Sequence, residues 1–396
     1  MTFRELLEKY KEGTLTEEEK KLVESELEKN EAINDYLAEK LDLTSSFMST
    51  EEIQSDMTIK KVRKTVNRKL FKVVALSVIL VFVILFSMKY IVSPLVASQY
   101  YNPSKHTMEK FSEDFLYDLR ALNEVVNPGY GISYASAQDN GFGNYSLNFK
   151  STNLFTGESS SITGSLNQNQ PVAVSEYFMN NFGVTYNPLW IDTSDSEFYD
   201  KNVEIALKKS EEEIAFLKEL PNTSYISAYI LLEKSLTLEE LRELMYKYEN
   251  LKFNWCAVKV SNERLRKPIG FRINPYGDCD GMDTSYYKKY PALLLSDYFE
   301  TSDPDNSAGL LPGYQKHFLS LLQYLSDHSE IAETLTDYDL NFDEYLSYVK
   351  SNGINIYGVL VFGNPEALVS LYENEHVKSI DIDNVLPSIY STKYNN

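Results

Sequence analysis

Two cysteines carry the most reactive side chains in this sequence. Cys256 ends a predicted strand and Cys279 lies in a predicted loop, with 22 residues between them. A disulfide between them would persist only outside the cytoplasm; the alternative is one buried thiol and one free thiol. A nucleophilic cysteine needs a histidine and a third polar group held beside it, and no local motif supplies them. Cys256 and Cys279 are therefore a candidate disulfide.

The segment NPYGDCDGMD at residues 274–283 gathers three carboxylates, Asp278, Asp280 and Asp283, around Gly281. A calcium-binding EF-hand loop needs glycine at its sixth position and glutamate at its twelfth. Here glycine falls at the fourth position and Lys289 at the twelfth, which favours a solvated turn over a calcium site.

The sequence offers little other chemistry. It has only four histidines and contains no G-x-S-x-G, H-E-x-x-H or phosphate-binding loop. We therefore expect no enzyme, no metal ligands and no cofactor. A hydrolase on the outer surface stays open only if folding brings acidic residues with raised pKa values into one cleft.

The bulk properties restrict the possible partners. A chain of 396 residues predicts more than one folded unit. The formal net charge of −20 argues against a general nucleic-acid-binding surface, which needs clustered lysine and arginine. We expect no direct contact with nucleic acid.

One long apolar run separates a short N-terminal part of the chain from the larger C-terminal part that contains these residues. Residues 73–88 contain no charge, and after Lys89 apolar residues resume at Ile91. About 20 helical residues cross a bilayer, so we predict a transmembrane helix over residues 73–95, with Lys89 reaching the headgroups and Pro94 ending the helix. The alternative, a buried core helix, would rarely be apolar on every face.

The flanking charges predict the orientation of this helix. Seven basic side chains and no acidic one lie in the segment that precedes the run, residues 57–72. Basic flanks face the cytoplasm. We therefore expect a single-pass protein of the cell membrane with a cytoplasmic N-terminus and an extracellular C-terminus.

The cytoplasmic piece, residues 1–56, is acidic, with 16 acidic and 7 basic side chains. Gly13 suits a helix C-terminus, and Thr16 with Glu19 forms a capping box at the next helix start. A weak break near Asn30 predicts a third helix. So short a segment seldom buries a core alone, and no histidine or cysteine is present to bind zinc.

The apolar stripes of these helices therefore predict an interface with another protein; a loose three-helix bundle that acts as a spacer is the alternative. The predicted partner-binding residues are Phe3, Leu6, Leu7, Tyr10, Leu22, Val23, Leu27, Ile33, Tyr36 and Leu37.

The segment FRELLEKYKEGTLTEEEKKLVESEL, followed by a basic run, a span and a large outer region, resembles membrane-anchored anti-sigma factors of Gram-positive bacteria. More narrowly, it resembles the sigma factor regulator family, whose members have N-terminal and C-terminal modules. The absence of a histidine and cysteine pair in the arm places the resemblance with zinc-free members. The resemblance implies an extracytoplasmic-function sigma factor as the partner.

The outer region predicts a mixed fold. YSLNFKSTNLF and SSSITGSL alternate like strands of a meander, and residues 112–126 read as a helix. Two later segments, at 225–260 and 354–385, each read as strand, capped helix and strand, with caps at Thr237 and Asn364. Two βαβ units side by side predict a ferredoxin-like sandwich, unless the similarity of these common units is accidental. The ending also resembles the C-terminal module of the same family.

The predicted fold class is therefore α+β, with a short all-α arm, one transmembrane helix and an extracellular α/β region with two βαβ units. The predicted parts are a sigma-binding arm at 1–56, a basic segment at 57–72, the span at 73–95, a mixed region at 99–222 and a βαβ-repeat sensor domain at 223–390.

The predicted function is that of an anti-sigma factor. It would hold the sigma factor at the membrane and release it on an envelope signal that the outer domain, or a companion membrane protein, receives. The alternative is an extracellular ligand-binding or scaffolding module for the cell wall, with a cytoplasmic recruitment arm.

Overall fold

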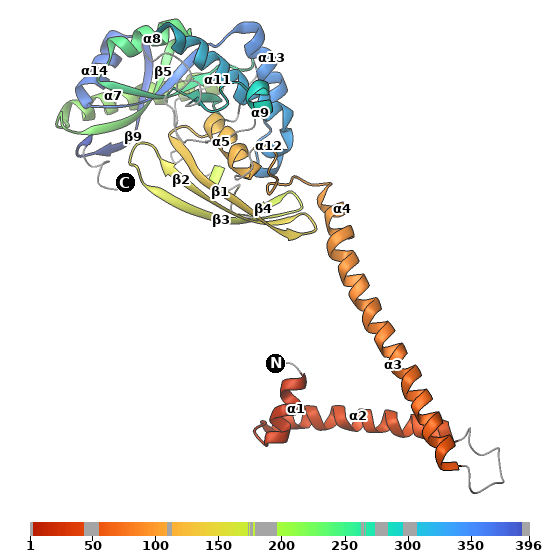
Figure 1. Ribbon diagram of the computed structural model, residues 1–396. Helices are drawn as coiled ribbons and strands as arrows, with labels where there is room; N and C mark the ends of the chain where they lie inside the picture. The colour runs from red at the N-terminus through yellow and green to blue at the C-terminus, as the bar shows by residue number, and fades with distance from the viewer. Residues whose placement is uncertain are drawn as a thin grey trace. The chain divides into compact units, whose positions relative to one another are not determined.

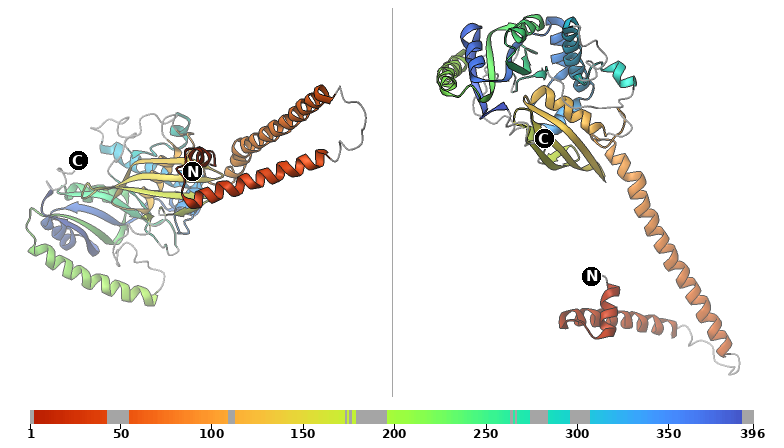
Figure 2. Two further views of the ribbon diagram at one scale, coloured as in Figure 1. Left: turned by 90° about the horizontal axis from the view of Figure 1, so that it is seen from below. Right: turned by 60° about the vertical axis from the view of Figure 1, so that its left-hand side comes forward.

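The computed structural model describes residues 3–42, 55–108, 113–172, 174, 177–178, 196–262, 265, 267–273, 284–295 and 307–389. The chain forms two compact units, Met1–Ile84 and Leu85–Asn396, called here the N-terminal unit and the C-terminal unit. Figures 1 and 2 show the elements of each. The fold is mixed α and β, as the sequence predicts, and both described sheets belong to the C-terminal unit.

The N-terminal unit begins with two helices, α1 (Phe3–Glu12) and α2 (Glu17–Asp42). Gly13 ends α1 with a positive φ of 72°, the conformation that glycine adopts most easily. The predicted break near Asn30 is wrong, because α2 runs through it. The Asn30 side chain donates to the carbonyl of Glu26 at 3.1 Å, so this residue bonds its own helix instead of interrupting it.

The long apolar helix consists of α3 (Ser55–Ser87), a π-helical turn η1 (Met88–Val92) and α4 (Ser93–Ala97). Helix therefore continues past Pro94, and the predicted stop at that residue is wrong. Proline lacks the N–H of a regular helical bond, but in the first turn of α4 that donor is not needed. Just before Pro94, the π-turn replaces the regular α-helical bond pattern, because the Ser93 N–H donates to the carbonyl of Met88, five residues earlier.

The first sheet of the C-terminal unit is the predicted antiparallel meander, in the order β1-β2-β3-β4. Its second strand alternates between buried and exposed residues, so one face packs inward and the other is open to solvent. The strands are β1 (Tyr130–Gly141), β2 (Asn144–Asn153), β3 (Ser159–Asn167) and β4 (Gln170–Val172).

The second sheet has five strands in the order β7-β6-β8-β5-β9. Its strands are β5 (Tyr225–Leu236), β6 (Leu251–Val258), β7 (Gly270–Arg272), β8 (Ile356–Gly363) and β9 (Val377–Leu386). The two predicted strand–helix–strand segments are β5-α8-β6 and β8-α14-β9, with α8 at Leu238–Lys247 and α14 at Pro365–Asn374. The predicted caps are confirmed, since the side chains of Thr237 and Asn364 accept N–H bonds at the helix starts.

The two segments interleave instead of lying side by side. β5 and β6 are both antiparallel to β8, so they run parallel to each other with β8 between them. In the same way, β8 and β9 run parallel with β5 between them. Each segment is thus a split βαβ unit that receives its central strand from the other unit.

Helix α5 (Asp114–Val126) lies at the centre of the C-terminal unit and is buried along almost its whole length. It packs against β1 and β7, one from each sheet. One hydrophobic core extends from Phe115 in α5 to Ile380 in β9 and so includes both predicted regions, 99–222 and 223–390. Other helices in the described parts of this unit are α7 (Ser196–Glu219), α9 (Thr284–Lys289), α11 (Ser307–Asp327), α12 (Ser329–Leu335) and α13 (Phe342–Asn352).

Candidate functional site

Helices α1 and α2, called here the helical arm, contact each other as a hairpin. The turn is fixed by the capping box that the sequence predicts. The backbone N–H of Thr16 donates to the Glu19 carboxylate at 3.1 Å, and the N–H of Glu19 donates to the Thr16 hydroxyl at 3.4 Å. The Thr16 hydroxyl also donates to the Glu19 carboxylate at 2.8 Å, and this bond, with the one from the Thr16 N–H, lowers the pKa of Glu19. Leu6 of α1 and Val23 of α2 are buried, which gives the hairpin a small apolar contact of its own.

Most of the other predicted partner-binding residues are uncovered. Leu7 and Tyr10 are half-buried. The exposed members are Phe3, Leu22, Leu27, Ile33, Tyr36 and Leu37. Covering exposed apolar side chains with a partner lowers the free energy of the system. An acidic helical hairpin with six exposed large apolar side chains is therefore suited to bind another protein. Leu6 and Val23 have a second role, since they hold the two helices together.

The apolar helix matches the expected span. Among the described residues, one helix, Lys64–Ala97, is long and apolar enough to cross a membrane. None of its most apolar window is buried within the protein. A core helix of a soluble protein would be covered, so the exposure of this one indicates a membrane anchor.

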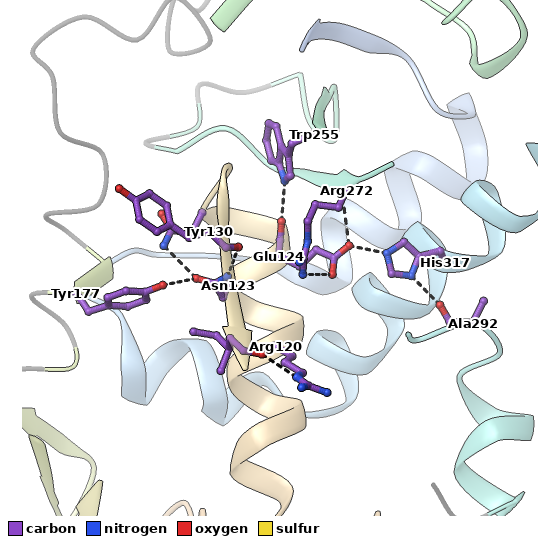
Figure 3. Close-up of polar contacts among 11 residues, drawn as sticks. Arg120, Asn123, Glu124, Tyr130, Tyr177, Trp255, Arg272, Ala292 and His317 are labelled. Atoms are coloured by element: carbon purple, nitrogen blue, oxygen red, sulfur yellow. Dashed lines mark hydrogen bonds and ion pairs between the residues drawn. The ribbon is translucent and has the colours of Figure 1, made fainter. Parts of the chain in front are cut away.

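A buried ion cluster joins α5 to β7 and α11 (Figure 3). The Glu124 carboxylate lies 2.6 Å from the Arg272 guanidinium and 2.6 Å from Nε2 of His317. His317 Nδ1 lies 2.7 Å from the carbonyl of Ala292. Because both partners of this ring are acceptors, both contacts are hydrogen bonds only when the ring carries two protons. Burial raises the pKa of Glu124, but the charges of Arg272 and His317 outweigh it and lower that pKa to about 2.

The same helix ties the two sheets together through neutral bonds. On the side of the meander, Asn123 donates to the carbonyl of Tyr130 at 2.8 Å and accepts from the hydroxyl of Tyr177 at 2.7 Å (Figure 3). On the other side, the indole N–H of Trp255 in β6 donates to the carbonyl of Glu124 at 2.7 Å. These contacts are structural, because they satisfy buried polar groups between rigid elements.

A second buried carboxylate, Asp118, lies six residues before Glu124 in α5. Asp118 accepts hydrogen bonds from the hydroxyls of Tyr101 and Tyr324. Burial raises the pKa of Asp118 to about 7, and the two tyrosine bonds offset only part of that effect. Of the three buried carboxylates of this helix, Asp114, Asp118 and Glu124, Glu124 is therefore paired with cations and Asp118 with hydroxyls.

Neither cluster carries a sequence motif. Their members lie far apart in the chain and meet only through the fold. One local signal could have pointed to them. The predicted helix at 112–126 contains several polar residues, whereas a helix that lies in the core is expected to be apolar.

The candidate disulfide stays a prediction. Cys256 is buried in β6, and burial raises the pKa of its thiol well above the ordinary value. Cys279 and the acidic loop at 274–283 lie outside the described residues. A thiol so protected is a poor nucleophile.

Comparison with known proteins finds a family match over the second sheet and its flanking helices. Residues 217–384 match the family described as sigma factor regulator C-terminal. A 174-residue stretch is 25% identical to a protein named probable anti-sigma-M factor YhdL, from Bacillus subtilis (strain 168). That match covers 43% of this chain and 41% of the relative, so the chain spans less than half the length of the curated relative that it matches. No solved structure matches the chain significantly.

The family match begins at the end of α7 and ends within β9, so it contains both split βαβ units. The expected resemblance is thereby confirmed at the level of the family. Residues 217–384 are therefore similar to the C-terminal module of the sigma factor regulator family, and the chain is similar in part to a probable anti-sigma factor.

Proposed function

We propose that this chain is a single-pass anti-sigma factor, with the helical arm in the cytoplasm and the C-terminal unit outside the cell. The uncovered apolar helix supports the membrane placement. The seven basic side chains in residues 57–72 support the orientation, because basic flanks are retained on the cytoplasmic side. On this proposal the parts are the arm at 1–56, the basic segment at 57–72, the span at 73–95 and the outer region from 99 onward.

The arm sequesters an extracytoplasmic-function sigma factor through its exposed apolar side chains. The observation that carries this proposal is the hairpin with its own fixed turn and six exposed large apolar residues, in a chain whose residues 217–384 match the sigma factor regulator C-terminal family. The acidic surface of the arm adds attraction to a DNA-binding protein, whose surface is basic. When the arm covers the surface of the sigma factor that it binds, this surface can no longer contact RNA polymerase. The proposal assigns the chain a regulatory role and no catalytic one.

Purification of the full-length chain from the membranes of its own host tests this proposal. The eluted proteins are identified by mass spectrometry, and a chain that lacks residues 1–42 serves as the control. An extracytoplasmic-function sigma factor should be recovered with the full-length chain and lost with the truncated one. Recovery of no sigma factor, or equal recovery with both chains, would refute the proposal.

The sensor domain at 223–390, which contains the five-stranded sheet, receives the envelope signal, directly or through a companion membrane protein. Its four strands β6-β8-β5-β9 have the order of a ferredoxin-like sandwich, with two interleaved βαβ units and α8 and α14 as the crossover helices. On this assignment β7 is an added edge strand. The sensor domain at 223–390 and the mixed region at 99–222 act as one body, because they share a core.

A second candidate function, binding of the cell wall, is favoured by the open face of the meander. Three rows of cross-strand neighbours present short hydroxyl and amide side chains there, with one tyrosine and one lysine. The rows are Tyr134-Lys150-Ser161, Ser136-Asn148-Thr163 and Gln138-Ser146-Ser165, and all nine residues are exposed or half-exposed. Such a face could hydrogen-bond a polysaccharide. Sedimentation of the purified chain with isolated cell walls discriminates the two functions, since an anti-sigma factor has no need of that binding.

A further inference from the structure

A pocket of about 790 Å³ opens where the apolar helix joins the C-terminal unit. One wall is the helix itself, from Leu85 through the π-turn to Ser98. The other wall comes from the segment that contains Tyr100, Asn102 and Lys105 and from the β1–β2 turn at residues 139–142. All of these residues belong to the C-terminal unit.

The walls of the pocket are fixed by short-range contacts. The Ser93 hydroxyl accepts the N–H of Phe142 at 2.7 Å, so the β1–β2 turn is bonded to the end of the helix. Gly143, with φ +75°, lies against the Tyr100 ring so closely that an added Cβ would approach the ring to 2.7 Å. These two contacts fix the β1–β2 turn against the helix end and against Tyr100, which line the pocket with it.

The lining changes from apolar to polar along the helix. Leu85 and Met88 belong to the apolar run, whereas Ser98 and Asn102 line the end beyond it. Such a gradient matches the boundary between acyl chains and headgroups, where one end of a ligand is apolar and the other hydrated.

The charges in the pocket favour an anion. Lys89 and Lys105 both line it, and in the described parts of the chain neither lysine forms an ion pair. Asp139 also lines it, but its carboxylate accepts the N–H of Gly141 at 2.7 Å within the turn. Among the described residues, the pocket therefore has two cations outside any ion pair and one carboxylate that is already bonded.

We propose that this pocket binds an anionic phospholipid of the leaflet next to the C-terminal unit. Lys89 and Lys105 attract the phosphate, and the acyl chains lie along Leu85 and Met88. The inference rests on the membrane placement of the proposed function but not on the sigma factor. A bound lipid of this kind would fix the height of the C-terminal unit at the membrane surface.

The test uses the full-length chain in detergent with mixed phosphatidylglycerol and phosphatidylcholine micelles, and measures retained lipid by native mass spectrometry. Lys89→Gln with Lys105→Gln is the test variant. Lys150→Gln, on the open face of the meander, is the matched control. Each pocket lysine should contribute about fivefold to phosphatidylglycerol retention, so the double variant should lose about 25-fold and the control nothing. Asp139→Asn should increase retention.

Three results would overturn the inference. They are equal retention of the two lipids by the wild-type chain, unchanged retention in the double variant, and displacement of the lipid by millimolar inorganic phosphate. The last result would identify a free anion as the ligand. Sigma factor recovered from the same samples reports separately on the proposed function, since it depends on residues 1–42 and not on the pocket lysines.

Discussion

Leu22 and Leu27 separate the binding role of the helical arm from its folding. Both residues are on α2, with exposed fractions of 55% and 42%, whereas Val23 between them is fully buried. Replacing the two leucines with alanine should therefore weaken the sigma factor complex and leave the hairpin folded. The same change at Val23 should loosen the hairpin first.

The magnitude depends on the area that is still exposed. Full burial of a leucine side chain contributes about 1.5–3 kcal/mol, and roughly half of that remains available at each of these residues. Each truncation should then cost about 1 kcal/mol of binding free energy. Together they cost about 2 kcal/mol, which is about a 30-fold increase in Kd.

Isothermal titration calorimetry measures this change, with the full-length chain in detergent and the sigma factor that co-purifies with it. Leu207→Ala in α7 is the matched control, because that leucine is 41% exposed but lies outside the arm. Circular dichroism of each variant checks that the helices persist. A Leu22→Ala/Leu27→Ala chain with native helicity and wild-type affinity would show that this face of α2 does not bind the sigma factor.

Three further predictions concern the C-terminal unit. Because the pKa of Asp118 is about 7 in the folded chain, above its ordinary value, this carboxyl makes the wild type less stable as the pH rises from about 4 to about 7. Asp118→Asn should reduce that slope in thermal melts between pH 4 and 7, and an unchanged slope contradicts it. Glu124 has the opposite sign: its pKa of about 2 stabilises the fold above about pH 4.5, and that stability is lost as the pH falls toward 2. Glu124→Gln should cost about 3–5 kcal/mol at pH 7 in urea unfolding, and a loss as large at pH 2.5 would exclude the ion cluster as its cause. Gly143→Ala should lower the melting temperature more than Gly353→Ala, since both residues have φ +75° but only Gly143 lies against a ring, that of Tyr100. Equal losses would show that the backbone strain at positive φ, and not the contact with the ring, is the cause.

The local elements could be predicted because their signals lie within a few residues. The capping box at Thr16 and the caps at Thr237 and Asn364 are chemical statements about one helical turn, and all three form. The apolar run likewise defined its helix. The two local errors, at Asn30 and Pro94, came from residues that usually interrupt helices but here find a compatible bond or position.

The arrangement of those elements could not be predicted in the same way. Element order alone allows two βαβ units to lie side by side or to interleave, and only the pairing of β5 with β8 decides between them. The Glu124 cluster depends on residues that are 148 and 193 positions away along the chain. Contacts of such range leave no periodic pattern in the sequence, so the polar residues of α5 gave no hint of their partners.

The bond from Phe142 to Ser93 has a mechanical consequence. The helical residues 85–97 belong to the folded C-terminal unit, and the bond joins them to a turn that lies 49 positions later in the chain. A pull on these helical residues therefore acts directly on the β1–β2 turn at the edge of the meander, and does not first have to straighten the chain segment between them.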